Sequence, residues 1–181
     1  IPGVTVINPG DPVTIKKAVH AMIEHIGPCY LKIGSPKMPV LYPEDIEFKL
    51  GKGIVMQEGS DVTLIGTGTV LSKAVDAAKL LKKAGISVRL IDIHTIKPLD
   101  RDLILTAARE IGKIVTVEEH FVAGGLGSAV AELCSQEQPV KMKMIGLPDQ
   151  YASNGPYEEL LGKYGLQSDQ ICETIIKFLN T

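Results

Sequence analysis

Residues Val62 to Ile93, VTLIGTGTVLSKAVDAAKLLKKAGISVRLIDI, indicate the fold class of this 181-residue chain. Apolar runs at residues 62–65 and 86–93 predict two buried strands. Between them, apolar residues at helical spacing predict a helix over residues 70–84 that ends before Gly85: Leu71, Ala74, Val75, Ala78 and Leu81. Two strands joined by a helix of this length predict a parallel crossover.

The same alternation of strand and helix extends from residue 53 to residue 181. Further strands are predicted at 53–57, 114–117 and 140–145, and further helices at 100–110, from the Gly124–Gly127 turn to 136, from Pro156, and at 168–179 with Ser168 as the cap. The turn Glu58-Gly59-Ser60-Asp61 is short enough for an antiparallel pair between the strands that flank it. The predicted fold is α/β: a three-layer α/β/α sandwich with a mostly parallel five-stranded sheet and one antiparallel edge strand.

The N-terminal segment predicts a separate strand–helix–strand unit. Residues 4–7 are typical of a buried strand, Asp11 and Pro12 form a strong helix start, and residues 29–33 form a second apolar run. The helix places several apolar residues on one face: Ile15, Ala18, Val19, Met22 and Ile26. A single unit of this kind cannot bury both faces of its strands, so it is expected to be the tail of a larger domain or to pack on a partner.

A connector rich in proline and charge follows at residues 36–52. Such segments mark domain boundaries, because few contacts cross them. The chain is therefore divided into a β-α-β fragment of a second α/β domain with its linker at 1–48 and a whole domain at 49–181.

Composition excludes several classes of function. The apolar fraction of 45% is too high for a disordered tail, and 19 basic against 21 acidic residues, without a long run of one sign, support neither a nucleic-acid nor a membrane surface. No apolar stretch approaches the roughly 18 residues of a spanning helix, and no signal peptide is visible. The three cysteines, without a C-x-x-C pair, are interpreted as reduced residues of a cytoplasmic protein.

Familiar cofactor motifs do not fit. Gly66-Thr67-Gly68 follows a strand and opens a helix, but Leu71 stands where a dinucleotide fingerprint requires glycine. The turn is therefore interpreted as a tight strand–helix connection. Neither the histidines nor the cysteines have the spacing of metal ligands, so no metal site is expected. Nucleophile-elbow and P-loop patterns are also absent from the sequence.

Three groups of residues remain as candidates for binding. The loop residues Gly124, Gly125, Gly127 and Ser128 lead into a helix, whose first N–H groups could hold a carboxylate or a phosphate, or could pack on a partner subunit. Glu119 and His120 end a strand at the edge where α/β sheets collect ligands. Glu118 and Glu119 are expected to point to opposite faces, so they cannot act as a carboxylate pair. Around the end of the strand at 29–33, Lys32, Ser35 and Lys37 could contact a phosphate, or could be solvated linker residues.

Several stretches, taken in order, resemble transketolases: Ile1–Ile7, Gly27–Leu31, Thr95–Asp100, Val115–His120 with Gly124–Val130, and Tyr157–Leu161 with Tyr164–Leu166. Each stretch has low specificity by itself, but the ordered set spans nearly the whole chain. The resemblance assigns residues 1–48 to the end of the pyrimidine-binding domain and 49–181 to the transketolase C-terminal domain.

This resemblance implies a thiamine-diphosphate enzyme of pentose phosphate chemistry that moves a two-carbon ketol unit from a ketose to an aldose. In the family, thiamine diphosphate and Mg²⁺ lie between two subunits, and the glutamate and the aromatic residue that contact the cofactor's aminopyrimidine ring precede the stretch seen here. No catalytic residue is therefore carried over, and no cofactor is expected on this chain alone. The implied partners are a homodimer or a complementary N-terminal portion, with this chain supporting dimer contacts and the substrate channel.

One position departs from the family pattern. Alignment through Pro36 and Tyr42 places Ser35 where transketolases of this type carry an arginine for the sugar phosphate. Serine cannot supply a bidentate positive charge. Lys32 or Lys37 are the candidates to replace it; otherwise the parent enzyme acts on a substrate without that phosphate.

Two other interpretations stay open. One is a related thiamine-diphosphate protein, either deoxyxylulose-phosphate synthase or the beta subunit of an oxoacid dehydrogenase, although the stretch from Tyr157 to Leu166 favours transketolase. The other is a non-catalytic module that binds an anion or a partner through the Gly124–Ser128 loop.

Overall fold

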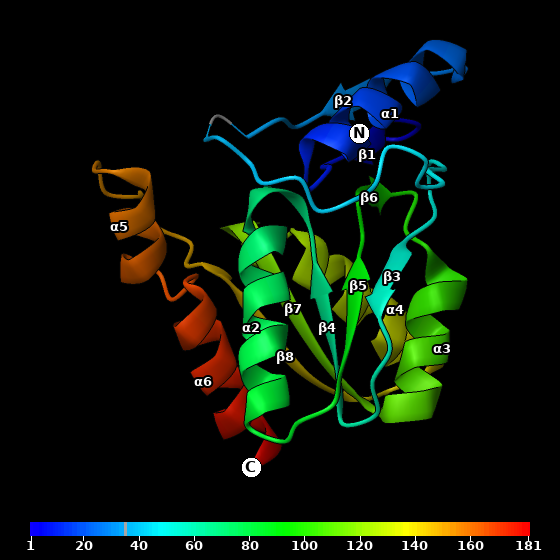
Figure 1. Ribbon diagram of the computed structural model, residues 1–181. Coiled ribbons are helices and arrows are strands. Elements are labelled where there is room, and N and C mark those ends of the chain that lie inside the picture. The colour runs from blue at the N-terminus through cyan, green and yellow to red at the C-terminus, as the bar shows by residue number, and fades with distance from the viewer. Residues whose placement is uncertain (35) are drawn as a thin grey trace.

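The computed structural model describes residues 1–34 and 36–181, and its larger sheet has five strands (Figure 1). In the order in which they pair, these are β3 (Ile54–Gln57), β5 (Val88–Asp92), β4 (Val62–Gly66), β7 (Lys113–Phe121) and β8 (Lys141–Leu147). The β3–β5 pair is antiparallel, and the pairs β5–β4, β4–β7 and β7–β8 are parallel. This confirms the predicted mostly parallel sheet with one antiparallel edge strand.

The expected pairing of β3 with the next strand along the chain is wrong. β5 lies between β3 and β4, so the turn at residues 58–61 passes across the start of β5. Gly59 makes this crossing possible, because a Cβ there would overlap the backbone of Val88 and Arg89. The arrangement gives β4 a parallel neighbour on each side, and every residue of β4 is buried.

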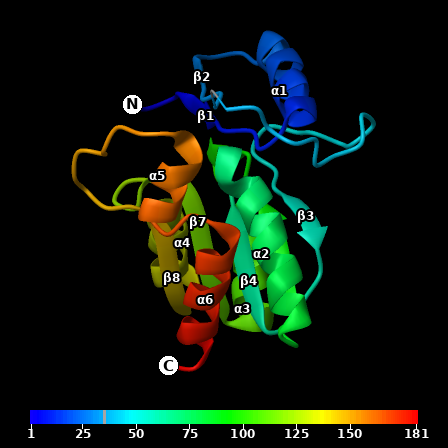
Figure 2. The same ribbon diagram turned by 60° about the vertical axis from the view of Figure 1, so that its left-hand side comes forward.

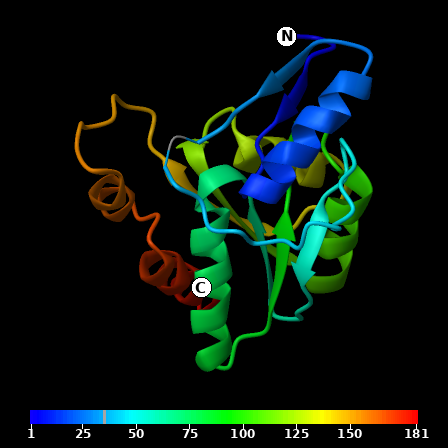
Figure 3. The ribbon, with the colours of Figure 1, turned by 45° about the horizontal axis from the view of Figure 1, so that its top comes forward.

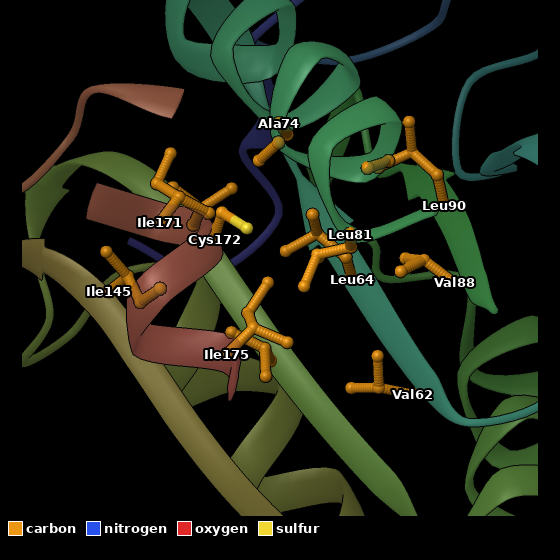
Figure 4. Close-up of a cluster of buried hydrophobic side chains, with 14 of the residues drawn as sticks. Val62, Leu64, Ala74, Leu81, Val88, Leu90, Ile145, Ile171, Cys172 and Ile175 are labelled. Atoms are coloured by element: carbon orange, nitrogen blue, oxygen red, sulfur yellow. The ribbon is translucent and has the colours of Figure 1, made fainter. Parts of the chain in front are cut away.

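Helices cover both faces of this sheet (Figure 2). One face carries α2 (Leu71–Lys83), α5 (Tyr157–Lys163) and α6 (Ser168–Leu179), and the other carries α3 (Arg101–Ile111) and α4 (Leu126–Glu137). A single 3₁₀ turn, η1 (Gly68–Val70), leads from β4 into α2. Figure 4 shows side chains of β4, α2 and α6, among them Leu64, Leu81 and Ile175, meeting in the core on the first face. Each such buried aliphatic side chain stabilises the fold by roughly 1.5–3 kcal/mol.

The smaller sheet has three strands in the order β2 (Cys29–Leu31), β1 (Thr5–Ile7) and β6 (Thr95–Lys97). β1 and β2 are parallel and are joined by α1 (Pro12–Glu24), as predicted. The pattern of apolar residues does not predict β6, which lies in the expected strand-to-helix connection and pairs antiparallel with β1. Figure 3 shows β1, β2 and α1 lying over the end of the larger sheet.

Helix caps explain two boundaries. Asp11 caps α1 as predicted: its Oδ1 accepts the backbone N–H of Thr14 at 2.7 Å, and Pro12 occupies the first helical position. Ser168 is not the cap of α6, because the N-cap is Gln167, whose backbone N–H donates to the side chain of Gln170. Ser168 is instead the first helical residue.

The smaller unit leaves apolar side chains in contact with solvent. Ile23 and Ile26 are 77% and 98% exposed, and further large apolar residues of α1, β2 and their flanks are partly exposed: Val19, Tyr30 and Ile33. The side of α1 that is buried carries Val13, Thr14 and Ala18. We call Val19, Ile23, Ile26, Tyr30 and Ile33 the apolar residues of the outer unit. Among the described residues, no helix is both long and apolar enough to cross a bilayer.

Candidate functional site

The carboxyl ends of the parallel strands β4 and β7 lie side by side, at the point where the order of the strands reverses. From β4 the chain moves to β5 on one side of the sheet, and it later returns through β7 and β8 on the other side. In open α/β sheets this topological switch point is where ligands bind. Thr67 follows β4, and Glu118 to His120 belong to the end of β7, so the sequence placed several polar candidates at the right edge.

Glu118 belongs to β7, and its side chain binds the N-terminus of α4. Its two carboxylate oxygens accept the backbone N–H groups of Leu126 and Gly127, each at 2.7 Å, and the residue is 2% exposed. Burial raises the pKa of Glu118, while these two N–H groups oppose the rise. Gly125 fits against this carboxylate because a Cβ there would overlap it. The carboxylate bound at the helix N-terminus thus belongs to the chain itself.

The rest of the Gly124–Ser128 loop is closed by its own hydrogen bonds. The Ser128 hydroxyl accepts the N–H of Gly124 at 2.8 Å and donates to the carbonyl of Val122 at 2.8 Å. Gly124 has a φ of 79°, which favours glycine. An external anion would therefore have to compete with Glu118 for the N–H groups of Leu126 and Gly127, and the predicted anion site on this loop stays a prediction.

Glu119 points to a different set of partners. Its Oε2 accepts the hydroxyl groups of Tyr157 at 2.8 Å and of Thr69, which joins β7 to α5 and to η1. Burial, followed by the nearby carboxylate of Glu119, raises the pKa of Tyr157. The expectation that Glu118 and Glu119 do not form a carboxylate pair agrees with these separate partners. Both carboxylates are bound by hydrogen bonds that hold elements together.

A cavity of about 210 Å³ lies between the smaller sheet and the switch point, and we call it the junction pocket. The wall from the smaller sheet and its flanks contains Val6, Asn8, Tyr30, Lys32 and Ile96, and the wall from the larger sheet contains Thr67, Glu118, His120, Gly124, Gly125 and Leu126. The structure therefore brings together several of the predicted residues, including Lys32, whose Nζ donates to the carbonyl of Glu119 at 2.8 Å. His120 Nδ1 lies 2.8 Å from the carbonyl of Phe121, so it is the protonated nitrogen that donates.

The other two candidates of the lysine group lie elsewhere. Lys37 lines a separate cavity of about 220 Å³, next to Thr69, Ser72, Lys73 and Tyr157. Ser35 lies outside the described residues. Lys32 and Lys37 thus line different cavities.

Sequence reasoning missed a buried polar contact of the linker. Tyr42 is buried, and its hydroxyl donates to Oδ2 of Asp92 at 2.9 Å. The backbone N–H groups of Leu41 and Tyr42 donate to Oδ2 of Asp11, at 3.0 and 3.1 Å. Burial raises the pKa of Asp92 to about 7, with a further contribution from the charge of Asp11. An aspartate inside an apolar strand run, Leu90-Ile91-Asp92-Ile93, was the signal that could have pointed to this contact.

His94 is packed rather than ligating. Its ring stacks on Phe48 with centroids 4.1 Å apart, and burial lowers its pKa to about 4. Its Nδ1 lies 3.0 Å from the hydroxyl of Thr95. Within residues 1–34 and 36–181, no cluster of three or more His, Cys, Asp or Glu side chains could hold a metal ion.

Comparison with known proteins identifies the larger unit. The family described as "Transketolase, C-terminal domain" matches residues 51–171. One of the subunits of the apulose-4-phosphate transketolase of Phocaeicola vulgatus is 37% identical over 179 residues, which cover 98% of this chain and 57% of the relative. The 1-deoxy-D-xylulose-5-phosphate synthase of Syntrophotalea carbinolica is 34% identical over 183 residues, covering 99% of this chain and 29% of that protein.

A solved structure agrees with these sequences. It is described as "Split gene transketolase, inactive beta4 tetramer", and it matches with a TM-score of 0.95 and 38% identity over 99% of this chain and 59% of that one. The chain therefore spans a little more than half the length of the split transketolase polypeptides that it matches. Taken with the observed five-stranded sheet and its covering helices, these matches show that the chain belongs to the transketolase C-terminal domain family.

Proposed function

We propose that this chain is the C-terminal region of a thiamine-diphosphate-dependent transketolase, which transfers a two-carbon ketol unit from a ketose to an aldose. The observation that carries the proposal is the match, over nearly the whole chain, to the apulose-4-phosphate transketolase polypeptide and to a split-gene transketolase structure. In this proposal the chain is inactive alone and works with a complementary N-terminal transketolase portion.

The exposed apolar residues of the outer unit support the need for a partner. Ile23 lies mostly in solvent near the end of α1, and Ile26, just beyond the helix, lies almost fully in solvent. Exposed apolar clusters of this kind mark interaction surfaces. A unit with strands β1 and β2 and the single helix α1 offers too little surface to bury these side chains by itself. We propose that the remaining polypeptide of the transketolase covers them.

The proposed division of the chain follows from the same reasoning. Residues 1–48 would complete a pyrimidine-binding domain, and residues 49–181 would form the C-terminal domain, which contains the family match at 51–171. The strand β6 complicates this division, because it belongs to the second part of the chain and pairs with β1 of the first. The two parts are therefore expected to move as one body.

Thiamine diphosphate and Mg²⁺ do not fit the described residues of the junction pocket. The junction pocket presents Lys32 but no second basic side chain of Lys or Arg among the described residues, and its helix N–H groups are taken by Glu118, so a diphosphate has few donors there. We propose that the cofactor is held by other polypeptide, with this chain supporting dimer contacts and one wall of the substrate channel.

For the acidic end of a sugar substrate, we propose Lys37 as the replacement for the arginine of related enzymes. Lys37 follows Ser35 by two residues and shares its cavity with Lys73. Lys32 lines the other cavity, the junction pocket, and so does not act together with Lys73. Replacing Lys37 with methionine in the assembled enzyme should raise the KM for a phosphorylated sugar and leave the KM for an unphosphorylated ketose unchanged.

Assembly with the complementary portion tests the proposed function. The chain and an N-terminal transketolase section should co-elute in size-exclusion chromatography as a complex larger than either alone. The substitution Ile23→Asp, on the exposed apolar side of α1, should weaken this complex, whereas Val55→Asp on the edge strand β3 serves as the matched control. Failure of the two polypeptides to associate at micromolar concentrations would count against the proposal.

The related synthase leaves a second candidate, because its sequence is 34% identical to this chain. Assaying the assembled enzyme with ketose donors and with pyruvate separates the two. Product formation from a ketose and an aldose is expected. Turnover that requires pyruvate would instead favour the synthase class.

A further inference from the structure

We propose that the junction pocket binds a small organic anion, a carboxylate or a phosphate on a short carbon chain, through the ammonium group of Lys32. This goes beyond ketol transfer and assigns a ligand to the region where the smaller sheet meets the larger one. The pocket lies at the switch point between β4 and β7, which is the position at which α/β sheets bind ligands.

The charges of the pocket wall favour an anion. Glu118 is the acidic residue of the wall, and both of its oxygens accept N–H groups at the positive end of α4. Lys32 is the basic counterpart and follows the end of β2, and the one hydrogen bond of its ammonium group to the described residues goes to an uncharged carbonyl, that of Glu119. Lys32 forms no salt bridge among the described residues, although its charge also favours the ionised form of Glu118. The carboxylate of Glu118 itself is bound by the two N–H groups of α4.

Lys32 is also held in position to act on a ligand. The hydrogen bond of 2.8 Å from Nζ to the Glu119 carbonyl uses one of its three N–H donors. Glu119 is fixed in turn by Tyr157 and Thr69. An ammonium group held in this way loses less side-chain entropy when it binds an anion.

The remaining wall residues indicate what kind of molecule carries the acidic group. Val6, Ile96 and Leu126 provide apolar surface for a carbon skeleton, and Asn8 and Thr67 provide polar groups for hydroxyls. Two hydrogen bonds fix the backbone of Asn8. Its N–H donates to the carbonyl of His94 at 2.8 Å, and its carbonyl accepts the N–H of Gly68 at 3.0 Å. This part of the wall is therefore preformed.

The same geometry excludes a nucleotide. In dinucleotide-binding sheets the pyrophosphate sits on the N–H groups of a helix start at the switch point. Here the N–H groups of Leu126 and Gly127 bind Glu118 instead. A volume of about 210 Å³ is also small for a nucleotide. The site is expected to take one acidic group on a few carbons and to reject ADP.

The test compares two ligands that share a carbon chain and differ in their acid group, glycerate and glycerol 3-phosphate, with ADP as the negative probe. Isothermal titration of the full-length protein in complex with its complementary portion, for the wild type and variants, gives the dissociation constants. We expect at least one of the two small anions to bind, and Lys32→Met to weaken it about tenfold, as expected for loss of one charge-assisted hydrogen bond. Lys32→Arg should retain binding, and Lys83→Met, at an exposed position at the end of α2, should not change it.

Hydrogen exchange provides a second readout that does not depend on a variant. Bound anion should slow amide exchange in the peptide containing Gly124 and Gly125 in the wild-type protein, and leave the peptide around Gly85 unchanged. Equal affinities of the wild type and Lys32→Met, ADP binding at the junction pocket, or no binding of either small anion at millimolar concentrations would overturn the proposal.

Discussion

The hydroxyl group of Tyr42 donates a hydrogen bond of 2.9 Å to the carboxyl group of Asp92, and this contact ties the linker to the end of β5. Oδ1 of Asp92 is buried without a hydrogen-bond partner in the described residues. Burial, and to a smaller extent the charge of Asp11, disfavour the ionised form of Asp92. Protonation of the Asp92 carboxyl group, which the linker contacts through Tyr42, therefore stabilises the folded protein.

This contact predicts that the stability of the protein depends on pH through Asp92. Burial raises the pKa of Asp92 in the folded protein to about 7, above its ordinary value of 3.8. The stabilisation is therefore complete below pH 4 and is lost as the pH rises to 7. Asp92→Asn should remove this loss. The free energy of unfolding of the variant minus that of the wild type should therefore be roughly 2–4 kcal/mol larger at pH 8 than at pH 4.

Urea unfolding of both proteins from pH 4 to pH 8 measures this difference. Asp149→Asn, at an exposed position, is the matched control and should follow the wild type at every pH. A difference between Asp92→Asn and the wild type that stays constant across the range would contradict the assigned role.

Two adjacent glycines should respond differently to alanine. Gly125→Ala would place a methyl group against the Glu118 carboxylate and the Phe121 carbonyl, and we expect a loss of roughly 2–4 kcal/mol. Gly124 has open space around it but a φ of 79°, so Gly124→Ala should cost only about 1–2 kcal/mol of backbone strain. Thermal or urea unfolding ranks the two variants. An equal loss at both positions would show that Glu118 does not define the fit of the loop.

Tyr157→Phe should loosen α5. The variant loses a hydrogen bond to Glu119 while keeping the aromatic ring, so the expected destabilisation is about 1 kcal/mol. Amides of residues 157–163 should exchange faster, because the bond links α5 to β7. Tyr151→Phe, at a fully exposed position, is the control. Unchanged protection of α5 in Tyr157→Phe would argue against the anchoring role of Glu119.

The sequence predicted the fold well where the period of apolar residues was regular. The strand–helix–strand unit from Val62 appears as β4, α2 and β5, with the turn η1 before the helix, and Gly85 follows the helix end as expected. Local signals could not show which strand pairs with β3, because that depends on how closely Gly59 approaches the backbone of Val88. They also missed β6, which is a strand only because β1 lies beside it.

The sequence predicted where the candidate residues lie, but not which groups their side chains contact. The glycines before a helix and the acids at a strand end lie at the carboxyl edge of the sheet, where the sequence placed them. That Glu118 would supply the carboxylate for the α4 N-terminus could not be read from a separation of eight or nine residues. The bend of the chain from Phe121 to Gly125 creates this contact, and a bend has no periodic signature. The same holds for Tyr42 and Asp92, which are brought together by the path of the linker.

The central claim is that this chain contributes to ketol transfer only as part of a larger transketolase. A coupled assay with a ketose donor and an aldose acceptor, supplied with thiamine diphosphate and Mg²⁺, tests it on the 181-residue polypeptide alone and together with a complementary N-terminal section. We expect no new sugar from the polypeptide alone and steady production once both are combined. Sugar formation by the isolated polypeptide, or none by the purified combination, would contradict the claim.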